Sequence, residues 1–190
     1  MLQVLFHILH SKVQICKTSI YKEKIILTLV PTIIVLLFYL ILLQVAVLQE
    51  WKFSTLKAQI VSVGIADNSL RFGKNEKPEK YGFKNICIYD SQGDIHHIGE
   101  WIQENSEVPN GHRIQLELNM NAKPHTLTFF IDEMQQKNYV TKIPSTVRFW
   151  VNFYESGAQF RILRFEKIQN STALFGRSTR NLEWGQEWKD

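Results

Sequence analysis

Residues 147–168 read VRFWVNFYESGAQFRILRFEKI, and this stretch decides the fold class of the chain. Apolar side chains recur at every second position from Val147 to Phe153, which is the period of a β-strand with one buried face. Phe160 to Ile168 is expected to run back as a second strand. Glu155-Ser156-Gly157 lies between the two runs and is typical of a turn. The stretch therefore predicts a β-hairpin, the strongest in the chain.

Upstream of this hairpin, shorter runs show the same alternation. A first strand is expected from about residue 55 to 65, followed by a long exposed loop over the polar residues 66–82. About seven short strands in all predict a mainly β domain, a small barrel or sandwich. The other expected elements are a hairpin over Phe83–Ile98 that turns at Asp90–Asp94, a loop or short helix over Gly99–Asn110 that carries Trp101, a turn at Pro109-Asn110-Gly111, strands at about 113–118 and 126–131, and a short helix from Asp132 to about Tyr139.

A different kind of segment precedes the β domain: Ile25–Leu48, IILTLVPTIIVLLFYLILLQVAVL, contains no charged residue. As a helix it would be roughly 36 Å long, enough to cross a hydrocarbon core of about 30 Å. It is longer than the apolar region of a signal peptide, about 7 to 15 residues, and no small-residue cleavage pattern ends it. The segment therefore predicts one transmembrane helix, an uncleaved signal anchor.

The charges beside this segment predict its orientation. Lys22 and Lys24 adjoin its N-terminal end, and lysines near a span are retained in the cytoplasm. Trp51 and Phe53 follow the span and are typical of an interfacial aromatic anchor. The expected layout is a cytoplasmic basic tail (1–24), the transmembrane helix (25–48), a mainly β extracytoplasmic domain (51–168) and a polar, loosely ordered C-terminal tail (169–190).

The net charge of +4 gives little support to nucleic-acid binding. Four lysines and one glutamate lie in residues 1–24, so much of the basic excess belongs to the membrane-proximal tail and not to a folded face. The two cysteines, Cys16 and Cys87, lie on opposite sides of the predicted span and cannot pair within one chain. Cys87 lies in an apolar strand pattern, which favours a buried thiol over an intermolecular disulfide.

No pattern of catalytic or metal-ligating residues emerges from the sequence. His96 and His97 are adjacent, and neighbours on a strand point to opposite faces, so they cannot readily share a metal. Asp90 and Asp94 flank a turn, which accounts for them without catalysis. His112 and His125 would join a site only through an unforeseeable fold. We therefore expect no catalytic residue, no metal, no cofactor and no enzyme.

Two groups of residues are candidates for binding a protein partner. Trp184 and Trp188 lie four positions apart in the tail, where they either dock on a partner or pack back to close the core. Asn170-Ser171-Thr172 matches a glycosylation acceptor, a pattern that also arises by chance. The second group is one face of the strong hairpin, either a partner-binding stripe with Arg161 and Arg164 nearby or a buried face: Arg148, Trp150, Asn152 and Tyr154.

The layout of an anchor and a small β domain resembles that of many bacterial membrane proteins, a likeness that implies no particular activity. The sequence favours a non-catalytic binding or assembly module of a cell-envelope complex, held in the bacterial inner membrane. Its expected partners are the lipid bilayer and an envelope protein, and not nucleic acid. The alternatives are a membrane-tethered immunity or inhibitor protein against a toxin, and an enzyme acting on envelope polymers.

Overall fold

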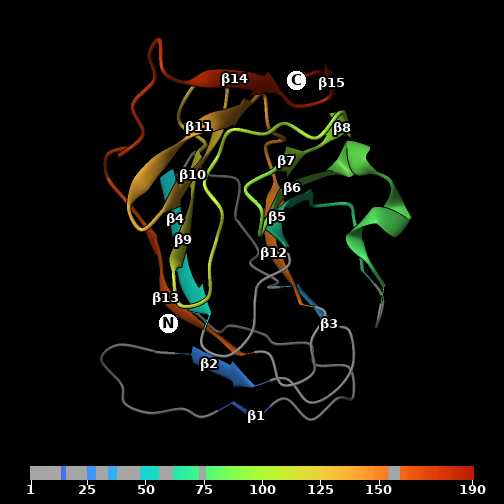
Figure 1. The fold of residues 1–190 in the computed structure, drawn as a ribbon, viewed down its shortest axis with the longest axis vertical. Coiled ribbons are helices and arrows are strands. Elements are labelled where there is room, and N and C mark those ends of the chain that lie inside the picture. Colours follow the sequence, from blue (N-terminus) through green and yellow to red (C-terminus); the bar gives the residue numbers. More distant parts are fainter. Residues whose placement is uncertain are drawn as a thin grey trace.

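The computed structural model describes residues 14–15, 25–28, 34–37, 48–55, 62–72, 76–153 and 159–190. These residues form two β-sheets that face each other, with a small third sheet near the C-terminus (Figure 1). The larger sheet has the order β1 (Gln14–Ile15), β2 (Ile25–Thr28), β13 (Gln159–Lys167), β4 (Leu48–Thr55), β9 (Arg113–Asn119), β10 (Thr126–Ile131), β11 (Met134–Thr141) and β14 (Arg180–Glu183).

The smaller sheet has five strands. Its order is β3 (Ile34–Leu37), β12 (Val147–Phe153), β5 (Ser62–Asp67), β6 (Ile86–Asp90) and β7 (Ile95–His96). Its β6–β7 pair is the predicted hairpin that turns at Asp90–Asp94, and β5 pairs with the other edge of β6. The third sheet pairs β15 (Glu187–Trp188) with β8 (Ile98–Gly99) in parallel. Two short 3₁₀ turns, η1 (Pro78–Tyr81) and η2 (Phe83–Asn85), precede β6.

The main core lies between the two large sheets, because each sheet turns its alternate apolar side chains inward. From the smaller sheet come residues such as Tyr89 and Phe149, and from the larger sheet residues such as Leu116 and Phe129. The rings of Tyr89 and Phe129 meet across the interface with their centroids 5.0 Å apart. The described part of the chain is therefore a mainly β sandwich, which confirms the mainly β domain of the predicted fold.

A second apolar cluster lies on the outer face of the smaller sheet. Its buried members include Ile86, Ile88 and Trp150, and the connection between β5 and β6 folds over them with Leu70 and Phe83. The sequence predicts this connection to be an exposed loop. Its apolar side chains instead pack on the sheet, so it forms a cover that is polar only on its outer side.

Gly64 on β5 lies in close contact with both the neighbouring strand β6 and the Trp150 ring. A Cβ atom at Gly64 would lie 1.8 Å from the carbonyl oxygen of Cys87 and 3.2 Å from the ring of Trp150. No side chain fits in that space, and glycine is the residue that permits such a close backbone approach.

The predicted helix from Asp132 to Tyr139 is wrong, because these residues form a turn and the strand β11. Asp132 and Glu133 have φ values of 46° and 74°, and they connect Ile131 to Met134 in a two-residue hairpin turn. Such a turn needs positive φ at both central positions. Asp132 was expected to cap a helix, but it supports this turn instead.

Residues 147–168 form the two predicted strands, β12 and β13, but these strands do not pair with each other as a hairpin. β12 lies in the smaller sheet between β3 and β5, whereas β13 lies in the larger sheet between β2 and β4. Arg161 and Arg164 are therefore on a different sheet from the stripe on β12. Alternation shows that each run has one buried face, but it does not specify the neighbouring strand.

Residues 169–190 were predicted to be a loosely ordered tail, but the structure shows two strands in them, β14 and β15. The first part of the tail crosses the outer face of the larger sheet, and we call residues 168–179 the strap. Beyond it, β14 joins β11 in parallel and β15 joins β8, and both strands lie at the top of Figure 1. Leu182 and Trp188 are buried in the main core.

Most of the predicted membrane span lies outside the described residues, as does most of the basic tail with Lys22 and Lys24. Within Ile25–Leu48 the structure describes β2, β3 and the first residue of β4, all of them extended. Trp51 and Phe53 lie in β4, between β13 and β9. No helix among the described residues is long and apolar enough to cross a bilayer. The transmembrane helix stays a prediction.

The predicted strand at about 55–65 is confirmed only at its end, where β5 begins at Ser62. Residues 56–61, whose alternation suggested that strand, lie outside the described residues.

Candidate functional site

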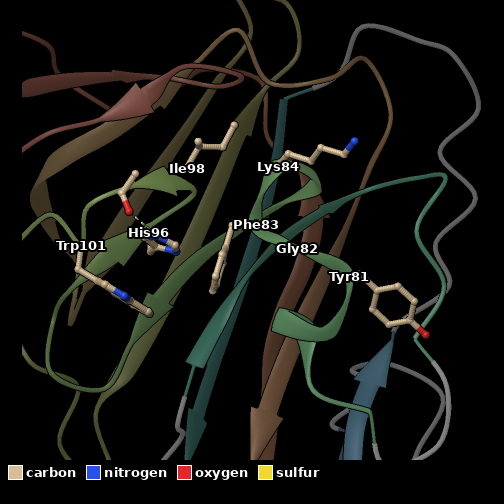
Figure 2. A pocket seen from close by; sticks show the side chains of 8 residues that line it. Tyr81, Gly82, Phe83, Lys84, His96, Ile98 and Trp101 are labelled. Atoms are coloured by element: carbon tan, nitrogen blue, oxygen red, sulfur yellow. Dashed lines mark hydrogen bonds between the residues drawn. The ribbon is translucent and has the colours of Figure 1, made fainter.

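An open pocket lies on the outer side of the smaller sheet, at the edge formed by β7 and β8 (Figure 2). Its volume is about 550 Å³, and four of its eight lining residues carry aromatic rings. Figure 2 shows Trp101, His96 and Phe83 side by side, with Tyr81 and Lys84 beyond Phe83. The lining residues are Tyr81, Gly82, Phe83, Lys84, His96, Ile98, Gly99 and Trp101.

Trp101 is the most exposed aromatic side chain of this pocket, with 41% of its surface accessible. Its ring stacks on the His96 ring at 4.5 Å with an angle of 16° between the planes. The next residue, Ile102, is fully buried, and its backbone exchanges two hydrogen bonds of 2.8 and 2.9 Å with Ile95. The backbone beside the exposed indole is thus held to the sheet.

His96 forms the centre of the pocket and is almost completely buried. The Phe83 ring meets it edge-on at 4.2 Å, on the side away from Trp101. Its Nε2–H donates to the carbonyl oxygen of Gly99 at 3.1 Å, and among the described residues Nδ1 has no hydrogen-bond partner. Burial lowers the pKa of His96, so the ring is held in its neutral form.

Gly99 brings the C-terminal strand up to the pocket. It has φ of +93°, and a Cβ atom there would lie 2.3 Å from the carbonyl oxygen of Trp188. The Glu100 N–H donates to that same oxygen at 2.9 Å. The edge of the sheet beside the pocket is therefore covered by β15.

The loop that carries Trp101 is fixed from the core side by buried polar groups of β11. The Gln136 side-chain oxygen accepts the Ser106 N–H at 2.7 Å, and the Asn138 amide donates to the Gln103 carbonyl oxygen at 2.7 Å. Tyr89 adds a hydrogen bond of 2.6 Å from its hydroxyl to the Ser106 carbonyl oxygen. These contacts satisfy the backbone of an irregular loop and keep it in one position.

The stripe that the sequence singled out lies on β12, where the β5–β6 connection covers Trp150 and contacts Arg148. Arg148, Trp150 and Asn152 have 4%, 0% and 0% of their surfaces accessible, which agrees with the buried-face alternative. Arg148 donates from Nε to the side chain of Asn68 at 2.8 Å and from its guanidinium to the Leu70 carbonyl oxygen at 3.0 Å. It thereby holds the covering loop to β12. Tyr154 lies outside the described residues.

Trp184 and Trp188 pack against the domain, as the core-closing alternative predicts. Their rings lie 4.3 and 5.4 Å from the ring of His97. His97 donates from Nδ1 to the Ile86 carbonyl oxygen at 2.6 Å and accepts the Gly185 N–H at Nε2, at 2.9 Å. Burial lowers its pKa, so both nitrogens are satisfied in the neutral ring.

The remaining sequence candidates have structural roles. Oδ1 of Asp90 accepts the N–H groups of Gln92 and Asp94, each at 2.9 Å, which explains the acidic turn. Cys87 is buried, and burial raises the pKa of its thiol, whereas Cys16 lies outside the described residues. The described part of the chain contains no group of three metal-ligating side chains.

Buried Glu117 explains the Asn170-Ser171-Thr172 triplet in structural terms. Its carboxylate accepts hydrogen bonds from the hydroxyls of Ser171 and Thr172, at 2.5 and 2.6 Å, and from the Thr172 N–H at 3.1 Å. The two hydroxyl residues therefore fasten the strap to β9. The same three residues keep their match to a glycosylation acceptor, which these contacts do not test.

Sequence reasoning missed Phe83 and Trp101 as site residues. Extending the strand alternation back from Tyr89 and Cys87 would place Phe83 on their face of the sheet, but Phe83 lies in η2 and packs on the opposite face. The only available signal for Trp101 was a large apolar residue within a polar loop.

Comparison with known proteins shows the fold. No family model and no curated protein matches the chain. A human SPRY domain is similar in structure, with a TM-score of 0.56 at 13% identity, over 73% of this chain and 90% of that chain. The SPRY domain of human HERC1 gives a TM-score of 0.47 at 18% identity, over 78% of this chain and 85% of that chain. The lectin UEA-II in complex with galactose gives a TM-score of 0.39 at 10% identity, over 80% of this chain and 85% of that chain. The chain thus has a SPRY-like β-sandwich fold.

Proposed function

We propose that this chain is a non-catalytic protein-binding module and that the pocket around Trp101 is its binding face. The observation that carries the proposal is the partly exposed Trp101 ring, stacked on buried His96 and attached to a fixed backbone. Exposed tryptophans held in place are typical centres of binding energy, since they bury a large area on association and lose little conformational freedom.

The rest of the pocket suits the same role. Phe83 continues the row of rings beyond His96, and Tyr81 and Lys84 also line the pocket farther from Trp101 (Figure 2). An apolar side chain of a partner could be buried there while polar groups at the rim set its orientation. The strands β7 and β8 supply His96, Ile98 and Gly99, whereas Trp101 and Phe83 lie in a loop and a short turn, where binding residues concentrate.

The membrane is the second part of the proposal, and it depends on the sequence of Ile25–Leu48. A span there would hold the domain close to a membrane surface and raise its effective concentration for membrane proteins. We therefore propose a protein partner in the same membrane or cell envelope, with the domain outside the cytoplasm.

Comparing two variants in a pull-down from the source cells tests the proposal. Trp101→Ala removes the exposed ring of the pocket, and Phe175→Ala is the matched control, because Phe175 is 47% exposed on the distant strap. Proteins retained by the native chain and by Phe175→Ala should be lost with Trp101→Ala. If all three chains retain the same proteins while melting at similar temperatures, this pocket is not the binding face.

A further inference from the structure

The loop on one side of the pocket is strongly basic. Residues 71–84, RFGKNEKPEKYGFK, contain five lysines and arginines and two glutamates, although the charge of the whole chain is only +4. This loop leads through η1 and η2 to Phe83 and Lys84, and of its basic residues Lys84 lines the pocket.

The fold sorts these charges between the two sides of the loop. Lys77, Lys80 and Lys84 are exposed, whereas Glu76 and Glu79 are half-buried. The Glu76 carboxylate accepts from the Tyr81 hydroxyl and from Lys80, an ion pair that fixes it against the loop. Lys80 is thus neutralised by Glu76, and the exposed positive charge that lines the pocket is that of Lys84.

Near Trp101 the exposed charge is negative. Glu100 precedes Trp101 in the sequence and is exposed, and its carboxylate accepts the Asp190 N–H at 3.0 Å. The lining of the pocket therefore includes one lysine, Lys84, and a carboxylate lies next to Trp101 in the sequence. A ligand that crosses the pocket will be selected for its charge at each end.

We infer that the pocket binds an acidic peptide segment of its partner, whose apolar side chain lies against Trp101 and Phe83 and whose carboxylate faces Lys84. The inference rests on the proposed function and adds the chemical class of the partner. An anionic lipid surface fits less well, because it would bring negative charge to Glu100 as well as to Lys84, whereas a peptide can place a single carboxylate at the basic end.

Peptide selection on the purified full chain tests the inference. A phage-displayed library of random linear peptides is selected on the native protein, and affinities of the enriched peptides are measured by fluorescence polarisation. Peptides with Asp or Glu close to an aliphatic or aromatic residue should be enriched. Lys84→Glu should lower the affinity for these peptides by roughly two- to fivefold, the scale of an exposed charge pair. Lys167→Glu changes an exposed charge on the other sheet and should leave the affinity unchanged.

The outcomes separate the two proposals. Peptides that depend on Trp101 but lack acidic residues and tolerate Lys84→Glu would overturn the acidic class and leave the binding face intact. Displacement of the peptides by glycerophosphoserine, the soluble headgroup of phosphatidylserine, would overturn it in favour of lipid. Peptides whose affinity is unchanged by Trp101→Ala would overturn the proposed function itself.

Discussion

Nε2 of His97 accepts the Gly185 N–H at 2.9 Å, and this hydrogen bond joins the β6–β7 region to the turn before β15. Because Nδ1 of the same ring donates to the Ile86 carbonyl oxygen, the imidazole must be neutral to make both contacts. The C-terminal strand is thus held by a group whose protonation would break its attachment.

The first prediction is a loss of stability in mild acid. Burial lowers the pKa of both His97 and His96, so the native state binds fewer protons than the unfolded chain, whose histidines titrate near about 6.5. The free energy of unfolding should therefore be highest above that pH and should decrease as the pH drops below it, because unfolding then takes up protons. Urea titrations at neutral and mildly acidic pH, followed by tryptophan fluorescence, measure this.

His97→Phe keeps an aromatic ring beside Trp184 and Trp188 but removes both hydrogen bonds of the imidazole. It should cost about 1 to 3 kcal/mol at neutral pH by leaving the Gly185 N–H and the Ile86 carbonyl oxygen unpaired. It should also make stability less dependent on pH, whereas His125→Asn, at a half-buried position outside this cluster, should behave as the native chain does. An unchanged pH dependence in His97→Phe would contradict the role assigned to this ring.

Gly64→Ala should be severely destabilising. The added Cβ would meet the Cys87 carbonyl oxygen at 1.8 Å, so two backbone segments in the centre of the smaller sheet must separate. We expect a loss of about 3 kcal/mol or more, at the upper end of the range for overpacking. Gly176→Ala is the control, because nothing lies within 4 Å of its Cβ position. Thermal unfolding of both variants decides the point, and similar melting temperatures would refute it.

Glu117→Gln should release the strap without unfolding the sandwich. The carboxylate accepts three hydrogen bonds from Ser171 and Thr172, and the amide loses the charge and part of the accepting capacity. We expect a loss of about 1.5 to 3 kcal/mol, the scale of hydrogen bonds to a charged group. Hydrogen exchange should accelerate at the Thr172 amide. The exposed Glu107→Gln serves as control, and unchanged exchange at Thr172 would show that Glu117 does not hold the strap.

Membrane association tests the prediction for Ile25–Leu48. If this segment spans a bilayer, the full chain should remain in the membrane pellet after alkaline carbonate extraction. Leu40→Arg combined with Ile41→Arg places two charges inside this segment and outside β3. Each arginine should cost up to about 2.5 to 3.5 kcal/mol of insertion free energy, so the variant should move to the supernatant. Release of the native chain into the supernatant would contradict the predicted anchor.

Much of the sandwich was predictable where one face of a strand is uniformly apolar. Ile114, Leu116 and Leu118 alternate with polar residues, and β9 lies where that pattern places it. The strand β11 was missed because its inward positions include Gln136 and Asn138, which are buried to hold the Trp101 loop. A period based on apolar residues cannot detect a strand whose buried side chains are polar.

The binding face was not predictable from local patterns. Trp101 and Phe83 come from separate loops, and they share a surface only because both flank His96. Conversely, Trp150 shares its strand face with the polar residues Arg148 and Asn152, so the sequence left open whether that face is exposed, and the β5–β6 connection covers Trp150. Which aromatic residue is exposed depends on what the tertiary fold places over it, and strand alternation does not contain that information.

The most direct measurement of the central claim is site-specific photo-crosslinking. A benzophenone amino acid in place of Ile98, which lines the pocket beside the intact Trp101, samples the proposed binding face, and the same group at position 175 samples the strap. If the pocket is the binding face, position 98 should give a discrete cross-linked partner that is absent from position 175 and is competed by the unlabelled native chain. Equal cross-linking from both positions, or a partner found only at position 175, would contradict the proposal.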